Sequence, residues 1–278
     1  MKLSEIKQLL ASGGIRLTKS LGQNFLHDGN QLRRIVEAAD LKPTDKVLEI
    51  GPGLGPLTEL LLEKAGHVLA IEKDRRLAGI LSQRLASARN LTLVRDGALE
   101  HLRGEPRNWS EWKLVANLPY SAASRILVEL ARATDGPRLM VATLQLEVAR
   151  RLMARPPDPD YGVLSLLVQL HYQPRGCFKI PADCFFPAPD VDSGCVTLIR
   201  RPAPLLGADQ TGTFAKIVKR AFSQRRKMMS KLLSADWARE RIERAFEEAG
   251  LPPGVRAEAV RLEQYVELTR RLGGDSHA

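Results

Sequence analysis

Cysteine is scarce in this sequence, and its spacing excludes two kinds of stabilising framework. The three cysteines, Cys177, Cys184 and Cys195, are odd in number, and none belongs to a C-x-x-C pair. We therefore expect free thiols, with neither a disulfide framework nor a zinc site. The histidines form no H-x-x-x-H pair, so we expect no bound metal ion.

Long apolar runs are missing as well. No uninterrupted apolar stretch is long enough to span a membrane, and the first 20 residues lack the apolar centre of a secretion signal. Hydrophobic residues make up 44% of the chain and charged residues 27%, which is typical of an ordinary globular protein. We expect a cytoplasmic protein that does not associate with membranes.

Acidic residues are outnumbered, which favours an anionic partner. The chain has 42 lysines and arginines against 32 aspartates and glutamates, a net charge of +10. Such a balance favours nucleic acid, although many basic proteins bind none. No acidic residue interrupts the helical stretch from 216 to 231, which suggests a surface that contacts phosphates; alternatively, its charges solvate a helix or pair with acidic groups. Its basic residues are Lys216, Lys219, Arg220, Arg225, Arg226, Lys227 and Lys231.

A glycine-rich loop is the most prominent motif that is present. An apolar run ends at Ile50, the glycines Gly51, Gly53 and Gly55 follow, and an amphipathic pattern then begins at Pro56. This order predicts a strand, a tight loop and a helix whose amide groups face a ligand. A plain strand-to-helix turn is the alternative. Because Pro56 stands where a dinucleotide fingerprint has its third glycine, the loop looks more like an S-adenosylmethionine site.

Polar residues follow several apolar runs at the points where strands are expected to end. Strand and helix patterns alternate from 46 to 154, which predicts a parallel sheet covered on both faces. Ligands bind beyond the carboxyl ends of such strands, where Gly51, Glu72, Asp96 and Asn117 stand. Glu72 suits a pair of ribose hydroxyls. Asp96 suits an adenine amino group, or else caps a short turn.

The tetrapeptide from Asn117 to Tyr120 suggests a site for a planar amine. Pro119 keeps Leu118 out of helical geometry, so the Asn117 side chain and the Leu118 carbonyl can both face the strand end. Two acceptors beside the Tyr120 ring fit an amino group on a base that stacks on the ring. A structural turn with a packed tyrosine is the alternative reading.

The predicted secondary structure changes twice in the second half of the chain. Runs at 168–178 and 191–200 predict an antiparallel hairpin that completes the sheet. Between them, prolines flank Phe185 and Phe186, which either hold a ring at the mouth of a site or are buried in the core. After Pro202 the pattern is helical only. We therefore predict a Rossmann-like α/β domain at 1–202 and a small all-α domain at 203–278.

Five motifs together resemble the small-subunit rRNA adenine dimethyltransferases of the KsgA type, over a region from Leu17 to about Leu268. Where relatives commonly have a third proline this chain has Ala188, and Ser121-Ala122 replace a frequent Asn-Ile. Both changes concern loop rigidity and leave the ring-bearing positions intact. The motifs occupy residues 21–26 (LGQNFL), 49–55 (EIGPGLG), 117–120 (NLPY), 185–193 (FFPAPDVDS) and 221–227 (AFSQRRK).

This resemblance implies a reaction and a set of roles. The implied activity is methyl transfer from S-adenosylmethionine to N6 of two adjacent adenines near the 3′ end of 16S rRNA, in the immature small subunit, by a monomer. Asn117 and the Leu118 carbonyl of the 117–120 turn, which contains Pro119, would receive the amine, and Tyr120 and Phe185 would sandwich the adenine. The residues that would line the S-adenosylmethionine site are Asn24, Leu26, Gly51, Gly53, Glu72, Asp96 and Asn117.

Two alternatives remain open at this point. The 23S rRNA adenine methyltransferases of macrolide resistance share the glycine loop and an Asn-x-Pro-aromatic motif, but the loop at 185–193 and the basic helix favour the small-subunit enzymes. A non-catalytic ribosome-assembly factor on the same fold is the other alternative. The intact loop from Glu49 to Gly55, together with Glu72 and Tyr120, argues against it.

Overall fold

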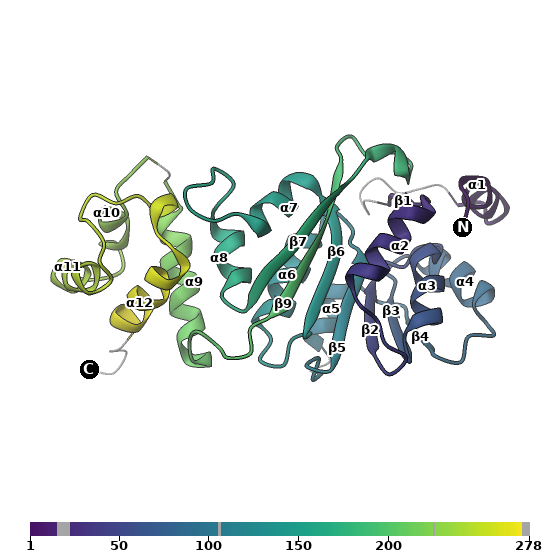
Figure 1. Cartoon of the computed structure of the whole chain (residues 1–278), viewed down its shortest axis with the longest axis horizontal. Coiled ribbons are helices and arrows are strands. Elements are labelled where there is room, and N and C mark those ends of the chain that lie inside the picture. Colours follow the sequence, from purple (N-terminus) through teal and green to yellow (C-terminus); the bar gives the residue numbers. More distant parts are fainter. Residues whose placement is uncertain (16–22, 105–106, 225, 274–278) are drawn as a thin grey trace. The chain divides into compact units, whose positions relative to one another are not determined.

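The chain folds into two compact units, one α/β and one helical. A computed structural model describes residues 1–15, 23–104, 107–224 and 226–273 (Figure 1). The first unit comprises Met1–Ala149 and Pro174–Arg200, and the second comprises Arg150–Gln173 and Arg201–Ala278. The predicted α/β class, with a mostly parallel sheet and helices at the C-terminal end, is confirmed.

A seven-stranded sheet forms the centre of the first unit, in the order β4-β3-β2-β5-β6-β9-β7. The first five strands in this order pair in parallel, and β9 runs antiparallel to β6. The antiparallel direction brings the start of β9 to the edge where the parallel strands end. The strands are β2 (Lys46–Ile50), β3 (His67–Ile71), β4 (Leu91–Val94), β5 (Trp112–Asn117), β6 (Leu139–Gln145), β7 (Tyr172–Ile180) and β9 (Ser193–Arg200).

Helices bury both faces of this sheet. Val47 and Leu48 are neighbours on β2 and point to opposite faces, yet neither is exposed. On one face Val47, Val68 and Val115 share a core cluster with Leu61. Besides α1 (Leu3–Ser12) in the N-terminal arm, the helices of this unit are α2 (Gly29–Ala38), α3 (Pro56–Lys64), α4 (Arg75–Arg84), α5 (Ala98–Gly104), α6 (Ala123–Arg132) and α7 (Leu146–Met153), which extends into the residues of the second unit.

The N-terminal arm is tied to the loop between β7 and β9. After α1 (Leu3–Ser12), the short strand β1 (Phe25–Leu26) pairs antiparallel with β8 (Phe185–Phe186). Leu26 is opposite Phe185 and Phe25 is opposite Phe186. Two segments that are far apart in sequence therefore meet beside the glycine loop, where a Cβ added to Gly53 would collide with the ring of Phe25.

The second unit is a helical bundle with its own core. Phe214, Leu233, Phe246 and Tyr265 are buried in one cluster. In the part of the chain that the structure describes, no helix is both long and apolar enough to cross a membrane. The helices are α8 (Val163–Gln169), α9 (Thr211–Ala221), α10 (Met229–Leu233), α11 (Arg239–Glu248) and α12 (Leu262–Gly273).

The division into units differs from the predicted domains in residues 150–173. These residues were expected in the first domain, but their apolar side chains belong to the helical core: Tyr161 and Leu166 are buried there. The Tyr161 hydroxyl donates to the Val260 carbonyl at 3.0 Å, which ties the segment to the C-terminal helices. Val168, expected at the start of a strand, lies in α8 instead.

The basic stretch at 216–231 is not one helix, contrary to expectation. Helix α9 ends at Ala221, and α10 begins at Met229. The Met229 amide donates to the Val255 carbonyl at 2.9 Å, a partner outside its own helix. This bond uses the donor that a continuous helix would direct to the carbonyl four residues earlier.

Candidate active site

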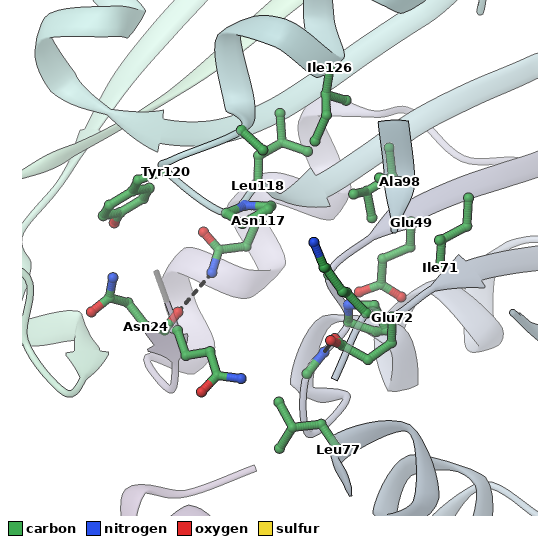
Figure 2. A pocket seen from close by; sticks show the side chains of 18 of the residues that line it. Asn24, Glu49, Ile71, Glu72, Leu77, Ala98, Asn117, Leu118, Tyr120 and Ile126 are labelled. Carbon is green, nitrogen blue, oxygen red and sulfur yellow. Dashed lines mark hydrogen bonds between the residues drawn. The ribbon is translucent and has the colours of Figure 1, made fainter. Parts of the chain in front are cut away.

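A cavity of about 440 Å³ lies at the carboxyl ends of β2, β3 and β5. Its position agrees with the rule that ligands bind beyond the carboxyl ends of parallel strands. In the view of Figure 2, Tyr120 and Asn117 lie on one side of the cavity, and Glu49 and Glu72 lie on the other. The lining includes these predicted residues: Asn24, Leu26, Gly51, Gly53, Glu72, Asn117, Leu118, Pro119 and Tyr120.

The glycine loop has a backbone that other residues rarely adopt. Gly51, Gly53 and Gly55 have φ angles of +71°, +59° and +87°. A Cβ on Gly53 would come within 2.8 Å of the Phe25 ring, and a Cβ on Gly55 within 2.4 Å of Leu81. The loop therefore needs glycine both for its conformation and for its close neighbours, and α3 begins directly after it.

Glu72 fastens this loop to the end of β3. One carboxylate oxygen accepts the Gly53 amide at 3.0 Å, and the other accepts the Asp74 amide at 2.8 Å. The residue is only 7% exposed, and burial raises the pKa of its carboxyl group. The carboxyl group lines the cavity, which is compatible with the predicted contact to ribose hydroxyls.

Glu49 is a second buried carboxyl group in the cavity, and the sequence reasoning gave it no role of its own. It is 1% exposed, and burial raises the pKa of its carboxyl group to about 8, with the nearby charge of Glu72 acting in the same direction. Its Oε2 atom has no hydrogen-bond partner among the described residues. The sequence feature that could have identified it is an acidic residue inside the apolar run of β2.

Asn117 presents an unused acceptor. Its Nδ2 donates to the Asn24 carbonyl at 3.0 Å, which sets the orientation of the amide (Figure 2). The Oδ1 atom is buried and has no hydrogen-bond partner within the described part of the chain. The next residue is anchored as well, because the Leu118 amide donates to the Thr143 carbonyl at 2.9 Å. A buried acceptor without a partner is costly unless a ligand supplies a donor.

Tyr120 and Phe25 are aromatic residues of the cavity lining, and Tyr120 belongs to the predicted amine site. Its hydroxyl is 2.5 Å from the Ser193 hydroxyl, at the start of β9. Burial raises the pKa of the Tyr120 phenol, so the group is neutral at physiological pH. Ser193 was not recognised as a site residue in the sequence, although it closes the motif at 185–193.

Phe185 and Asp96 are predicted site residues that the structure leaves outside the lining. Phe185 is 2% exposed and packs in the core with Leu26 and Ile180, so in this conformation it offers no face to a base. The alternation of side chains in β8 turns Phe185 inward. The Asp96 side chain is 46% exposed and accepts the amide of the next residue, Gly97, at 2.7 Å.

Two basic residues for which no role was predicted lie at the border of the cavity. Lys73 and Arg125 both contribute to its lining, and both are exposed. Arg125 has no acidic partner among the described residues and donates only to the Ser121 carbonyl, at 3.3 Å. Within the same residues, no group of three histidine, cysteine, aspartate or glutamate side chains could hold a metal ion.

The predicted basic surface in the second unit is divided into paired and unpaired charges. Lys216 and Arg220 contact Asp236 at 3.0 and 2.6 Å. Lys216 also lies over the Trp237 ring. The side chains of Lys219, Arg226, Lys227 and Lys231 are exposed and form no ion pair with any residue that the structure describes. Arg225 lies outside the described residues.

Comparison with known proteins identifies the family. Residues 14–273 match the family described as ribosomal RNA adenine dimethylase. The chain belongs to this family. It is therefore an rRNA adenine methyltransferase, and the cavity with Asn117 and Tyr120 is its candidate active site.

Relatives cover nearly the whole chain. The ribosomal RNA small subunit methyltransferase A of Pelotomaculum thermopropionicum is 40% identical, over 95% of this chain and 94% of the relative. The protein of the same name from Streptococcus pneumoniae strain P1031 is 37% identical, over 98% and 97%.

Solved structures show the same fold. The 23S rRNA methyltransferase ErmE has a TM-score of 0.70 and 31% identity, covering 90% of this chain and 99% of that one. A dimethyladenosine transferase from Plasmodium falciparum has a TM-score of 0.75 at 24% identity, covering 88% and 95%. The relatives that match over nearly full length at 37–40% identity are small-subunit enzymes.

Proposed function

We propose that this protein uses S-adenosylmethionine to dimethylate N6 of two adjacent adenines near the 3′ end of 16S rRNA. We further propose that it does so in the cytoplasm, as a monomer, on the immature small ribosomal subunit. Family membership and the names of the full-length relatives support the substrate. The buried Oδ1 atom of Asn117 carries the assignment of the amine site, because it is an acceptor that still needs a donor.

The glycine-loop side of the cavity fits the proposed methyl donor. S-adenosylmethionine carries its reactive methyl group on a positively charged sulfonium, and its amino-acid tail adds an ammonium group. Two buried carboxyl groups, Glu49 and Glu72, line this cavity. Burial raises the pKa of both, and a bound cation would stabilise their ionised forms. They would oppose the pyrophosphate of a dinucleotide, which agrees with the absence of the third glycine at Pro56.

On the other side of the cavity, the residues fit the adenine amine. Its nitrogen is a weak nucleophile because its lone pair is delocalised into the ring. The Asn117 Oδ1 and the Leu118 carbonyl would accept the two amino hydrogens and favour a pyramidal nitrogen whose lone pair faces the methyl group. The Tyr120 ring would stack on the base. Alignment and electrostatics supply the catalysis in this scheme, and no dedicated base is required.

Exposed cations would hold the RNA. Arg125 at the cavity would contact a phosphate next to the target nucleotide. In the second unit, Lys219, Arg226, Lys227 and Lys231 have no acidic partner among the described residues and remain available to phosphates. We include Arg225 in this surface on sequence grounds alone, and we assign Lys216 and Arg220 a smaller share because both contact Asp236.

The substrate assignment is tested by mapping the product. Small subunits from a strain without this modification are incubated with the protein and methyl-labelled S-adenosylmethionine, and large subunits serve as the control. We expect two adjacent N6,N6-dimethyladenosines near the 3′ end of 16S rRNA. Label in 23S rRNA would support the macrolide-resistance alternative. No label in either RNA would support a non-catalytic factor.

The RNA surface is tested by the salt dependence of subunit binding. Replacing Arg226, Lys227 and Lys231 by glutamine should weaken binding and reduce the slope of log affinity against log salt by about 0.7 to 0.9 for each phosphate that the variant no longer neutralises. A triple variant of Arg239, Arg270 and Arg271 removes the same charge from arginines that already pair with glutamates. Equal slopes for both variants would exclude a specific docking surface.

A further inference from the structure

Ser193 is a fully buried side chain that touches the aromatic ring system of the site. It is 0% exposed, so water cannot reach its hydroxyl. The Tyr120 hydroxyl, at 2.5 Å, is its hydrogen-bond partner, and either group can be the donor. The contact joins residues that are 73 positions apart and that belong to two different motifs, the turn at 117–120 and the loop at 185–193.

The fold holds Ser193 firmly in place. It is the first residue of β9 and pairs with Gln145 of β6. The preceding residue, Asp192, is fixed by three contacts. Its carbonyl accepts the Leu146 amide at 3.0 Å, and its side chain accepts the Ala182 amide at 3.0 Å and pairs with Lys179 at 2.7 Å.

Tyr120, in contrast, belongs to a turn. The carbonyl of Pro119 accepts the amides of Ala122 and Ala123 at 2.9 and 3.0 Å, so the backbone here leaves β5 and enters α6. The tyrosine ring is attached to this turn through two rotatable bonds. Its hydroxyl is the far end of the side chain, and the contact with Ser193 restrains that end.

We propose that Ser193 is a positioning residue: it holds the Tyr120 ring in the orientation that stacks the target adenine and directs its amine toward Asn117. The proposal rests on the proposed function, which assigns stacking to Tyr120. Ser193 touches neither substrate in this scheme and acts through the tyrosine alone. Loss of this contact should therefore lower kcat, because a small misplacement of the reacting atoms reduces the rate about 100-fold.

A different explanation is that the serine only satisfies a buried hydroxyl. Tyr120→Phe separates the two explanations because it keeps the ring for stacking and removes the restraint. If positioning is the role, Ser193→Ala and Tyr120→Phe remove the same interaction. Their effects on kcat should then be similar, and the double variant should be no slower than the slower single variant.

The experiment measures methylation of small subunits and the affinity for S-adenosylmethionine in wild type, both single variants and the double variant. We expect kcat to fall about 10- to 100-fold in each, KM for the subunit to change less than kcat, and donor affinity to stay within about twofold. Thr197→Val removes a hydroxyl from the same strand and serves as the control, with kcat at the wild-type level.

Three results would overturn the proposal. The first two are a wild-type kcat in Ser193→Ala, and effects of the two substitutions that multiply in the double variant. The third is an equal loss of kcat and donor affinity, because that pattern indicates a general structural role. If Ser193→Ala does not fold, the fall expected for Tyr120→Phe alone still decides the matter. Absence of RNA methylation by the wild-type protein would instead contradict the proposed function.

Discussion

The two units use tyrosine differently. In the helical unit, the hydroxyls of Tyr161 and Tyr265 donate to the carbonyls of Val260 and Ala257, both at 3.0 Å. Both rings belong to the core. In the α/β unit, the hydroxyl of Tyr120 contacts another side chain and its residue lines a cavity. A tyrosine that is satisfied by backbone supports the scaffold, whereas one held by a side chain can present its ring to a ligand.

The two units also differ in where they place their titratable side chains. The α/β unit buries the carboxyl groups of Glu49 and Glu72 in its cavity, where burial raises the pKa of both. The helical unit instead exposes lysines and arginines such as Arg226 and Lys227. Burial favours the neutral form of a carboxyl group unless a ligand compensates its charge, whereas exposed groups stay ionised and their interactions are screened by salt. This difference supports the proposal that the first unit carries out the chemistry and the second binds RNA.

The largest effect is expected at the amine acceptor. Asn117→Ala removes the Oδ1 atom and should lower kcat about 100- to 1000-fold, as the loss of one preorganised polar group in an active site does. A matched truncation in the helical unit, Gln264→Ala, should leave kcat unchanged. Methyl incorporation into small subunits, with both proteins checked for folding, measures the difference. Equal activities would remove the functional distinction between the units.

Glu72→Ala should act on donor binding. The variant loses charged hydrogen bonds worth about 1.5 to 3 kcal/mol each, so affinity for S-adenosylmethionine should fall roughly 10- to 100-fold. Asp96→Ala should cost less, because Asp96 lies outside the cavity lining. Calorimetric titration of both variants checks this order. A larger loss for Asp96 would restore the role that the family resemblance implies for it.

Glu49 should make stability depend on pH. Its pKa rises from 4.5 to about 8 on folding, so the folded state keeps a proton that the unfolded chain loses between these values. The stabilisation is complete below pH 4.5 and is lost as pH rises toward 8, by at most about 1.4 kcal/mol per pH unit. Glu49→Gln should flatten this dependence, and exposed Glu63→Gln should not. Thermal unfolding from pH 5 to 8 measures it, and parallel curves for Glu49→Gln and wild type would contradict the assignment.

The smallest effect is expected for a scaffold tyrosine. Tyr265→Phe leaves the Ala257 carbonyl without its donor and should lower the free energy of unfolding by about 1 to 2 kcal/mol. Activity at a temperature where the variant is folded should equal that of wild type. Denaturant unfolding and a methylation assay on one preparation test both statements. A fall in kcat without a loss of stability would mean that this tyrosine also serves the site.

Local patterns in the sequence were sufficient for much of the fold. The strand and helix around Gly51–Gly55 were predicted because the apolar period changes there, and Glu72 and Asn117 were located because strand ends of a parallel sheet converge. Residues 150–173 were misplaced, since which core accepts Tyr161 depends on contacts with distant helices. The contact between Tyr120 and Ser193 was not predictable, because it depends on the antiparallel register of β9.

Which side chains of a short segment point into the core could not be predicted from the sequence either. Phe185 and Phe186 are adjacent and chemically identical, and only the pairing with β1 turns Phe185 into the core. For Asp96, the strand-end rule gave the right edge of the sheet, but the next residue, Gly97, lines the cavity instead.

The central claim is that one cavity in the α/β unit binds the methyl donor and aligns the adenine with separate groups of residues. Tyr120→Ala tests it most directly, with donor affinity and the methylation rate of small subunits measured on the same preparation. The account predicts a fall in rate of about 100-fold or more with donor affinity within about twofold of wild type. An unchanged rate, or a parallel loss of rate and donor affinity, would contradict it.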